Sequence, residues 1–267
     1  MIRRIGVLKR RSRMNELLFL GSGAADWDLR RREAFFRRKS AALLNGHLLL
    51  DCGPHIWDFA RCENPQVLDG VTDVLITHDH DDHFCPESLL RLAENRHLRV
   101  ACDGWARETL GEHAHIEYIP VTPYEPFSLG KYKILPVLAN HDVILQGDRQ
   151  ACHYIIRTPD RKKLFYGMDG AWFLRPTWDE LRQHQFSVMV LDCTVGDRSD
   201  LRIFEHNSIP TLRMMVQQLR ECKIVEKDGV IVASHFSRSL HVSREQTEDA
   251  LRTADVCAAY DGMILRF

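Results

Sequence analysis

The sequence lacks long hydrophobic runs and a surplus of charge of either sign. Its longest clean apolar runs, such as Val188–Leu191, have the length of a strand, whereas a helix that crosses a bilayer needs roughly 20 apolar residues. We therefore expect no membrane association. Its 36 lysines and arginines are balanced by 37 acidic residues, for a formal net charge of −1. Because nucleic-acid binders usually carry a basic surplus, this balance argues against nucleic acid as a partner.

Paired cysteines are also absent. None of the eight cysteines belongs to a Cys-x-x-Cys pair, and they are spread along apolar segments. This distribution argues against a zinc site built from cysteines and against a disulfide framework. Free thiols are typical of the reducing cytoplasm, so we expect a cytoplasmic location.

No internal repeat, low-complexity linker or break in composition divides the chain, so we expect a single domain over residues 14–267. Residues 1–13 form a basic leader whose apolar part is too short for the core of a signal peptide. Met14 stands directly before the first strand-like run and is a second candidate start of the chain. We expect the leader to contribute little to function; the alternative is a basic arm with a role of its own.

Short apolar runs alternate with amphipathic stretches, which predicts strands and helices in alternation. The predicted strands are Glu16–Leu20, Ala41–Asn45, His47–Asp51, Asp73–Thr77, Leu98–Cys102, Ile116–Ile119, Lys131–Val137, Ala151–Arg157, Lys163–Gly167, Val188–Asp192, Val230–Ser234, Val256–Tyr260 and Met263–Phe267. The predicted helices are Pro86–Asn95, Gly104–Glu112, Thr177–His184, Ser208–Glu221 and Ser243–Ala254. Many strands with helices between them indicate an α/β architecture in which helices pack outside sheets.

The most informative motif begins where an apolar strand runs directly into three histidines and three aspartates, between Val74 and Phe84. Imidazole nitrogen and carboxylate oxygen suit Zn²⁺, Mn²⁺ or Fe²⁺. His78 and His80 are two positions apart, so in an extended segment they point the same way. Asp82 and His83 follow the turn and can face a second ion. The alternative is a solvated acidic loop, which so dense a group of ligand types at a strand end disfavours.

Metal-ligand residue types recur just after other apolar strands. Their positions are Asp51, His141, Asp169 and His235. In α/β sheets, ligands gather at the carboxyl ends of strands. We therefore expect these side chains to converge on one pocket, whereas Asp79 and Asp81, on the opposite parity of the motif, are poorer candidates.

The ordered set Asp51, His78-x-His80-x-Asp82-His83, His141, Asp169 and His235 resembles the five motifs of the metallo-β-lactamase superfamily, over nearly the whole chain from about Met14 to Phe267. The resemblance implies an αβ/βα four-layer sandwich, with two mixed β-sheets and outer helices. It also implies two divalent metal ions per chain, Zn²⁺ or Mn²⁺, with Fe²⁺ as a further option.

The resemblance assigns roles as follows. One ion would be held by His78, His80 and His141, the other by Asp82, His83 and His235, and Asp169 would bridge them. Asp51 would orient a ligand from behind. The candidate catalytic residues are Asp51, Asp82 and His206.

Three further stretches are similar to the phosphoribosyl 1,2-cyclic phosphate phosphodiesterases and, more loosely, to the transfer-RNA 3′-end endonucleases. They are Val188–Thr194, Glu205–Asn207 and Ala259–Met263. In that group a histidine at the position of His206 assists catalysis. This chain departs from the phosphodiesterases in lacking a cysteine-rich insertion near its N-terminus, and from the endonucleases in lacking a Gly/Pro-rich insertion that could serve as an arm for transfer RNA.

The resemblance implies a metal-dependent phosphodiesterase acting on a small cyclic or nucleotide-like phosphate, through a water activated by two ions. The alternatives are a carboxylic-ester, lactone or thioester hydrolase of the same fold, the endonuclease, and a single-iron oxygenase. The expected partner is a small-molecule phosphate ester. A homodimer is common in the family and is an expectation from the resemblance alone.

Residues 30–39 carry six basic groups between the first two predicted strands, where loops often cover a site. One interpretation is capture of a phosphate or another anion by Arg37 or Arg38. The other is a solvated basic loop.

Overall fold

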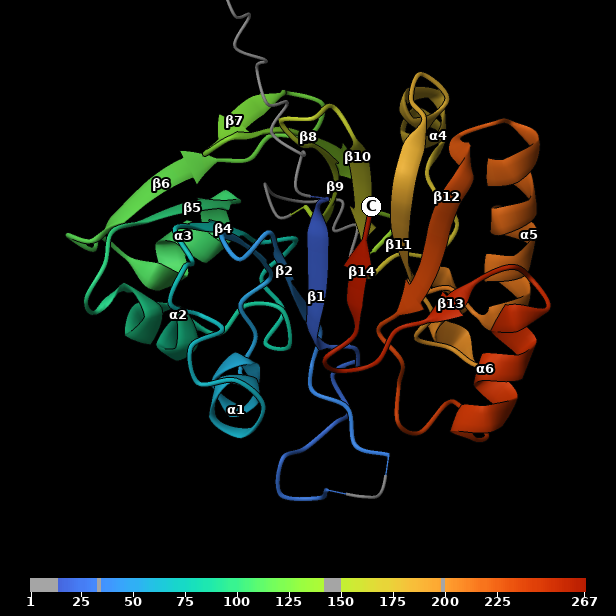
Figure 1. Cartoon of the computed structure of the whole chain (residues 1–267), viewed down its shortest axis with the longest axis horizontal. Helices are drawn as coiled ribbons and strands as arrows, with labels where there is room; N and C mark the ends of the chain where they lie inside the picture. The colour runs from blue at the N-terminus through green and yellow to red at the C-terminus, as the bar shows by residue number, and fades with distance from the viewer. Residues whose placement is uncertain (1–13, 33–34, 142–149, 198–199) are drawn as a thin grey trace, which may run out of the picture.

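The computed structural model of the chain describes residues 14–32, 35–141, 150–197 and 200–267, so the basic leader lies outside the described residues. Two seven-stranded sheets face each other, and helices cover their outer faces (Figure 1). The first sheet has the order β14-β1-β2-β3-β4-β5-β6, and the second has the order β13-β12-β11-β10-β9-β8-β7. The architecture is the four-layer αβ/βα sandwich that the sequence predicts.

The strands of the first sheet are β1 Glu16–Gly21, β2 Ala41–Leu44, β3 Leu48–Leu50, β4 Asp73–Leu75, β5 Leu98–Cys102, β6 Ile116–Pro120 and β14 Ile264–Arg266. Those of the second are β7 Phe127–Leu129, β8 Tyr132–Leu138, β9 Cys152–Arg157, β10 Lys163–Gly167, β11 Phe186–Asp192, β12 Val225–Ser234 and β13 Cys257–Ala258. The helices are α1 Ile56–Cys62, α2 Pro86–Ala93, α3 Gly104–Leu110, α4 Arg175–Leu181, α5 Ile209–Glu221 and α6 Arg244–Arg252, with a 3₁₀ turn η1 at Leu201–Phe204.

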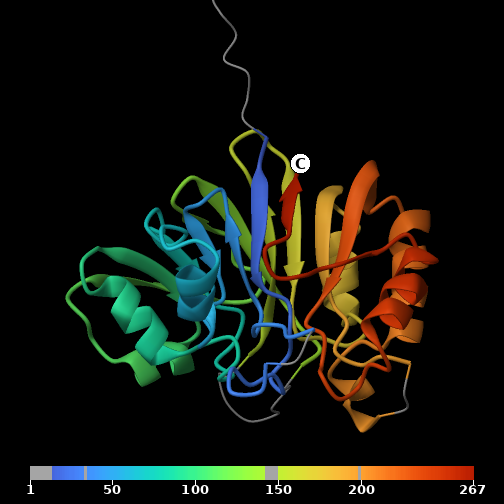
Figure 2. The same ribbon diagram turned by 60° about the horizontal axis from the view of Figure 1, so that its bottom comes forward.

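Each sheet has a parallel half that determines where the site lies. Strands β3 to β6 are parallel to one another, and so are β10 to β13. Strand β8 runs in the direction of β10, because both are antiparallel to β9. The carboxyl ends of these strands therefore share one edge, which comes forward in Figure 2.

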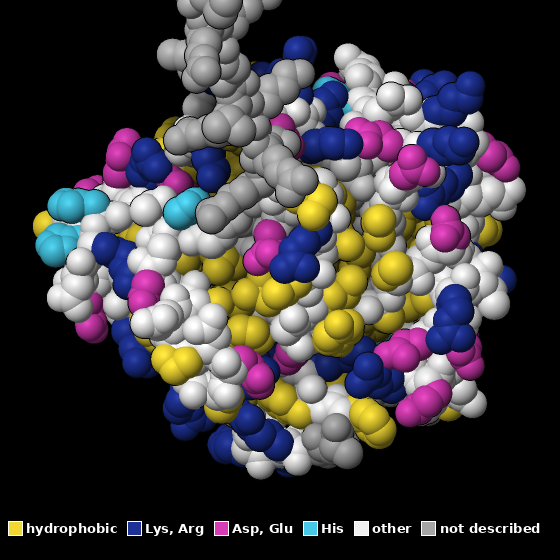
Figure 3. Space-filling model, in the orientation of Figure 1, with side chains coloured by type: hydrophobic (Ala, Val, Ile, Leu, Met, Phe, Trp, Pro, Cys, Tyr) yellow, Lys and Arg dark blue, Asp and Glu magenta, His cyan; other side chains and the backbone are white. Residues whose placement is uncertain are grey.

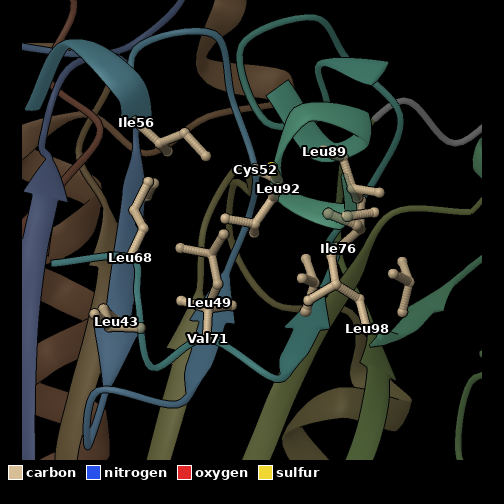
Figure 4. Packing of buried hydrophobic residues seen from close by; sticks show 14 of the residues in the cluster. Leu43, Leu49, Cys52, Ile56, Leu68, Val71, Ile76, Leu89, Leu92 and Leu98 are labelled. Atoms are coloured by element: carbon tan, nitrogen blue, oxygen red, sulfur yellow. The ribbon is translucent and has the colours of Figure 1, made fainter. Parts of the chain in front are cut away.

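Three apolar clusters hold the four layers together. The first packs α1, α2 and α3 on one sheet through residues such as Ile56, Leu89 and Leu49 (Figure 4). The second fills the space between the sheets, where Tyr154 and Tyr166 are almost completely buried. The third packs α4, α5 and α6 on the other sheet. Burying both faces of each sheet explains why the strands are apolar runs without alternation.

The surface holds some apolar side chains and exposed thiols. Figure 3 shows hydrophobic side chains in the middle of the face that carries β1 and β14, where Ile264 is 44% exposed. All eight cysteines are unpaired, and Cys62, Cys222 and Cys257 are exposed. Within the described part of the chain, no helix has both the length and the apolar character that spanning a membrane requires.

The sequence-based prediction of elements misses two. Helix α1 has seven residues and strand β7 has three, so neither is long enough for its periodicity to stand out. Strand β12 begins at Val225, five residues before the predicted start at Val230, because polar residues 226–228 interrupt its apolar run. Helix α4 begins at Arg175 rather than Thr177, with Pro176 in its first turn.

Candidate metal centre

The predicted ligands come together at the shared edge of the two sheets. His78 follows β4, His141 follows β8, Asp169 follows β10 and His235 follows β12. Three groups of side chains have ligand atoms within 4.8 Å of one another, and two of them are His78, His80, His141 and Asp169, and Asp82, His83, Asp169 and His235; the third, which overlaps them, is Asp169, Asp192, His206 and His235. In the first two groups all are buried except His80, which is partly exposed. These two groups are the two sets that the resemblance implies.

Asp169 stands between the two groups and turns one oxygen to each. Its Oδ2 lies 3.4 Å from His78 Nε2 and 3.6 Å from His141 Nε2. Its Oδ1 lies 2.9 Å from His235 Nε2 and 3.3 Å from His83 Nε2. This geometry is that of a carboxylate able to bridge two cations.

Hydrogen bonds behind the second group fix the tautomers of its histidines. Asp51 accepts at Oδ1 from the amide and hydroxyl of Thr77, and its Oδ2 lies 2.8 Å from His83 Nδ1. Because a carboxylate only accepts, His83 Nδ1 donates and its Nε2 presents a lone pair. Thr194 donates to Asp192, so His235 Nδ1 donates to Thr194 Oγ1 over 2.7 Å. His235 Nε2 is thereby the nitrogen that can present a lone pair to a metal ion in place of a proton.

The first group is oriented in the same way. His141 Nδ1 donates to the carbonyl oxygen of Glu205 at 3.2 Å. Thr77 Oγ1 already donates to Asp51, so it accepts from His78 Nδ1 at 3.0 Å. The Nε2 atoms of His78 and His141 therefore carry lone pairs toward Asp169.

The donor set fits divalent metal ions. In the second group, His83 Nε2 and His235 Nε2 face each other at 3.0 Å, and Asp82 Oδ2 lies 3.1 Å from His235 Nε2. His78 Nε2 and Asp169 Oδ1 are buried without a hydrogen-bond partner among the described residues. Converging lone pairs and carboxylates without donors are costly unless a cation lies between them. Imidazole and carboxylate ligands suit zinc, manganese and iron.

The electrostatics of the site agree with this fit. Burial lowers the pKa of His141 to about 3, which keeps its imidazole neutral and able to coordinate. Burial also opposes protonation of His235, but the carboxylates of Asp169 and Asp82 outweigh it and raise the pKa to about 10. The second group thus attracts positive charge, which a metal ion supplies as well as a proton does.

His206 lies beside both groups, and its partner Asp192 was not singled out from the sequence. His206 Nδ1 donates to Asp192 Oδ2 at 2.8 Å, and its ring centroid lies 4.8 Å from that of His141. Asp192 ends strand β11 and also accepts from the amides of Thr194 and Asn207. The signal that identifies Asp169 and His235, a ligand type at the end of an apolar strand, is equally present at Asp192.

Three of the site residues have backbones in the left-handed region. The φ angles of Asp51, Asp169 and His235 are 61°, 46° and 63°. Residues other than glycine seldom adopt this backbone conformation, although Asp and His tolerate it better than most. At these strand ends Asp169 and His235 turn into the ligand groups and Asp51 turns against His83 from behind. Strained residues cluster at functional sites.

Within the basic stretch at residues 30–39, the structure shows that both sequence-based interpretations are wrong for Arg38. Arg38 is 5% exposed, so it is not part of a solvated loop. It donates to Asp58 at 2.8 Å and to Glu63 at 3.2 Å, and Asp261 lies 3.5 Å away. These carboxylates neutralise it, so it is not an anion-capturing residue. Of the poorer ligand candidates, Asp81 is exposed and lies 3.8 Å from Lys39.

Comparison with known proteins identifies the family. Residues 47–236 match the family described as the β-lactamase superfamily domain. The chain belongs to this superfamily. A relative in Bacillus subtilis (strain 168), the UPF0173 protein YddR, is 26% identical over 187 residues, covering 68% of this chain and 69% of YddR.

Solved structures show the same fold. The metallo-β-lactamase fold protein YhfI from Bacillus subtilis superposes with a TM-score of 0.73 at 14% identity, covering 95% of this chain and 100% of YhfI. A diphosphatase of the PhnP family superposes with a TM-score of 0.71 at 18% identity, covering 95% of this chain and 98% of the diphosphatase. The fold is that of the metallo-β-lactamase superfamily, and the chain is a metal-dependent hydrolase of that superfamily.

Proposed function

We propose that this protein is a phosphodiesterase that acts on a small cyclic or nucleotide-like phosphate with two divalent ions, Zn²⁺ or Mn²⁺, with Fe²⁺ as a further option. The proposed ligands are His78, His80 and His141 for one ion and Asp82, His83 and His235 for the other, with Asp169 between them. When bound, the two ions would supply a Lewis-acidic centre that lowers the pKa of a water and offsets charge on phosphoryl oxygens.

The observation that carries the proposal is the His206–Asp192 pair beside both ligand groups. A ring nitrogen of His206 lies within 4.8 Å of ligand atoms of Asp169 and His235. Burial opposes protonation of His206, but Asp192 outweighs it and raises the pKa of His206. His206 is thereby suited to donate a hydrogen bond to a phosphoryl oxygen or a proton to the leaving oxygen.

The charge at the site favours an anionic substrate. A phosphodiester carries a negative charge before and during hydrolysis, whereas a carboxylic ester is neutral until the carbonyl is attacked. An imidazolium beside two ligand groups built for cations stabilises the phosphodiester throughout the reaction. The PhnP-family diphosphatase, which shares the fold, is by its name an enzyme of phosphate compounds, and this favours a phosphate substrate over a carboxylic ester.

The test compares phosphodiesters with carboxylic esters on the same metal-loaded protein. The panel holds a ribose 1,2-cyclic phosphate, bis(p-nitrophenyl) phosphate, a lactone and a thioester. We expect phosphodiester turnover that falls by roughly 10² to 10⁴ in His206→Ala, the usual range for a general acid.

His184→Ala is the matched control, because His184 also pairs with an acidic side chain, Glu180 at 2.9 Å, but lies just before β11, at the strand end opposite to the one that carries the candidate ligands. It should keep wild-type turnover. Hydrolysis of the lactone or thioester alone, unchanged in His206→Ala, would move the protein to the carboxylic-ester class.

A further inference from the structure

A cavity of about 180 Å³ lies between the start of α6 and the segment that joins β1 to β2, a segment that forms the loop at the bottom of Figure 1. Its wall includes Trp27, Arg37, Phe236, Ser243, Arg244 and Thr247. Eleven described residues line it, among them three arginines and no aspartate or glutamate. Arg37 and Arg244 also line an adjoining cavity of about 80 Å³. Positive charge therefore faces two adjoining, partly open cavities.

Arg37 is the least compensated of these cations. Its Nη1 donates to Ser22 Oγ at 2.7 Å and to the carbonyl oxygen of Ala259 at 2.6 Å, and its guanidinium lies 4.4 Å from the ring centroid of Phe236. All these partners are neutral, and no carboxylate of the described residues pairs with it. Burial lowers the pKa of Arg37 to about 10, as expected for a cation without a paired anion.

The acidic groups near the cavity already accept hydrogen bonds from groups other than Arg37. Asp261 accepts from the amide and hydroxyl of Ser22 and from the amide of Arg38. Glu248 accepts from Arg244 Nε at 2.6 Å, which leaves the two terminal nitrogens of Arg244 without an acceptor among the described residues. Asp26 accepts from Ser237, Ser239 and the amide of Arg238. No acid is left to fill the space in front of Arg37.

The start of α6 adds donors on the same wall. Ser243 caps the helix by accepting from the amide of Gln246 at 3.2 Å. Its hydroxyl hydrogen has no acceptor among the described residues, so it can donate into the cavity. The positive end of the helix dipole adds to the attraction for an anion.

We propose that this cavity binds the phosphate group of a small organic molecule, with Arg37 and Arg244 as the principal donors and Trp27 and Phe236 against the organic part. Guanidinium groups match phosphate oxygens with two parallel hydrogen bonds. A volume of 180 Å³ corresponds to roughly six water molecules in the liquid, below the usual range for a drug-sized ligand but sufficient for one phosphorylated group.

The cavity adjoins the metal centre but is separate from it. Phe236 directly follows the ligand His235, and His241 in the cavity wall donates to the carbonyl oxygens of Cys193 and Thr194 at 3.0 and 3.2 Å. Thr194 in turn holds His235. A phosphate bound here is either a free ligand or the far end of a substrate whose ester lies at the metal centre.

Isothermal calorimetry of the metal-loaded protein with ribose 5-phosphate and with inorganic phosphate tests the site. We expect Arg244→Gln to weaken binding about tenfold or more, the effect of losing one charge-assisted contact. Arg37→Gln should weaken it further. Arg252→Gln is the matched control, because Arg252 lies on the same helix and pairs with Asp249 on its exposed face; it should bind as the wild type does.

Equal affinity in the wild type and Arg244→Gln overturns the proposal. Binding that is lost in Asp169→Asn but kept in Arg244→Gln belongs to the metal centre and overturns it as well, while leaving the phosphodiesterase proposal intact. Phosphate binding that depends on Arg244 in a protein without phosphodiesterase activity keeps this site and rejects only the proposed function.

Measurements of KM distinguish a phosphate that belongs to the substrate from a phosphate of a separate ligand. If it belongs to the substrate, Arg244→Gln raises KM for a phosphodiester with an additional terminal phosphate and leaves KM for bis(p-nitrophenyl) phosphate unchanged. If it is a free ligand, Arg244→Gln leaves both KM values unchanged and lowers only the affinity for ribose 5-phosphate.

Discussion

His206 Nδ1 and Asp192 Oδ2 are joined by a 2.8 Å hydrogen bond, and Asp192 receives three further hydrogen bonds, from the amides of Thr194 and Asn207 and the hydroxyl of Thr194. The carboxylate is held rigidly and sets both the charge and the tautomer of His206. Asp192 is 1% exposed, so in the proposed reaction it would act on a substrate only through His206.

The first prediction concerns this pair. Asp192→Asn places an amide where the carboxylate accepted from His206, so the imidazolium loses its counter-charge. We expect kcat for phosphodiesters to fall about 10²-fold or more, with a smaller change in KM. Metal content, measured by elemental mass spectrometry, should stay at the wild-type level. A parallel loss of metal would mean that Asp192 supports the ligand His235 through Thr194 instead of orienting His206.

The second prediction concerns Asp51, which lies behind His83 rather than toward the bridging carboxylate. In Asp51→Asn the amide can donate to His83 Nδ1, which moves the imidazole hydrogen to Nε2 and removes the inward lone pair. We expect metal affinity to fall about 10- to 100-fold, as is usual for partners that orient a ligand. Competition with a chromogenic chelator measures this.

A graded control comes from Tyr166, whose hydroxyl donates to the same Asp51 oxygen over a longer 3.3 Å. Tyr166→Phe removes that bond without altering the charge, so it should weaken metal binding much less than Asp51→Asn. Equal metal affinity in the wild type and Asp51→Asn would show that Asp51 does not control the ligand.

The third prediction concerns Gly53, whose backbone lies close to the loop that carries Asp82. A Cβ atom at Gly53 would lie 2.2 Å from the carbonyl oxygen of Asp82, so alanine there must push the ligand loop away. We expect Gly53→Ala to lower the free energy of unfolding by about 1–3 kcal/mol and to reduce metal affinity. Gly104→Ala is the control, because Gly104 has open space around it at the start of α3. A Gly53→Ala protein with unchanged metal affinity would contradict the geometry.

The grouping of the candidate ligands could be predicted from the sequence because it depends on strand ends. Apolar runs followed by His or Asp locate His78, Asp169 and His235 in the chain, and parallel strands bring their ends to one edge. Residues that act through hydrogen bonds carry no such signal. Thr77 orients Asp51, and Thr194 orients His235, yet a threonine after a strand is too common to be identified as functional.

The partners of the arginines in the basic stretch could not be predicted from the sequence, for another reason. Arg37 and Arg38 are adjacent in sequence, but Arg38 meets Asp58 and Glu63 of the α1 region, whereas Arg37 meets Ser22 and Ala259. The different surroundings of these neighbouring arginines depend on tertiary partners, several of them far away in the sequence. Helix α1, which supplies Asp58, was itself too short to be predicted.

The fourth prediction concerns pH and stability at Asp58, whose carboxylate pairs with Arg32, Arg38 and Arg61. Burial alone would raise the pKa of Asp58, but the hydrogen bonds from Arg61 and Arg38 outweigh burial and lower it from 3.8 to about 2. The ion pairs therefore stabilise the fold above about pH 4, and this contribution is lost as the pH falls from about 4 to about 2.

Urea unfolding of the wild type and Asp58→Asn measures this contribution. The wild type should be more stable by about 2 kcal/mol at pH 7, and about half of that difference should have gone at pH 3. A difference that stays constant between these pH values would show that it arises from packing and not from the charge of Asp58.

The position of Asp169 between the two ligand groups is tested most directly by counting metal ions in the wild type and in Asp169→Ala, with phosphodiester turnover measured on the same samples. The account predicts about two ions per wild-type chain, and in Asp169→Ala a loss of bound metal together with a fall in turnover. One ion per wild-type chain, or an Asp169→Ala protein that keeps both its metal and its turnover, would contradict the two-ion centre.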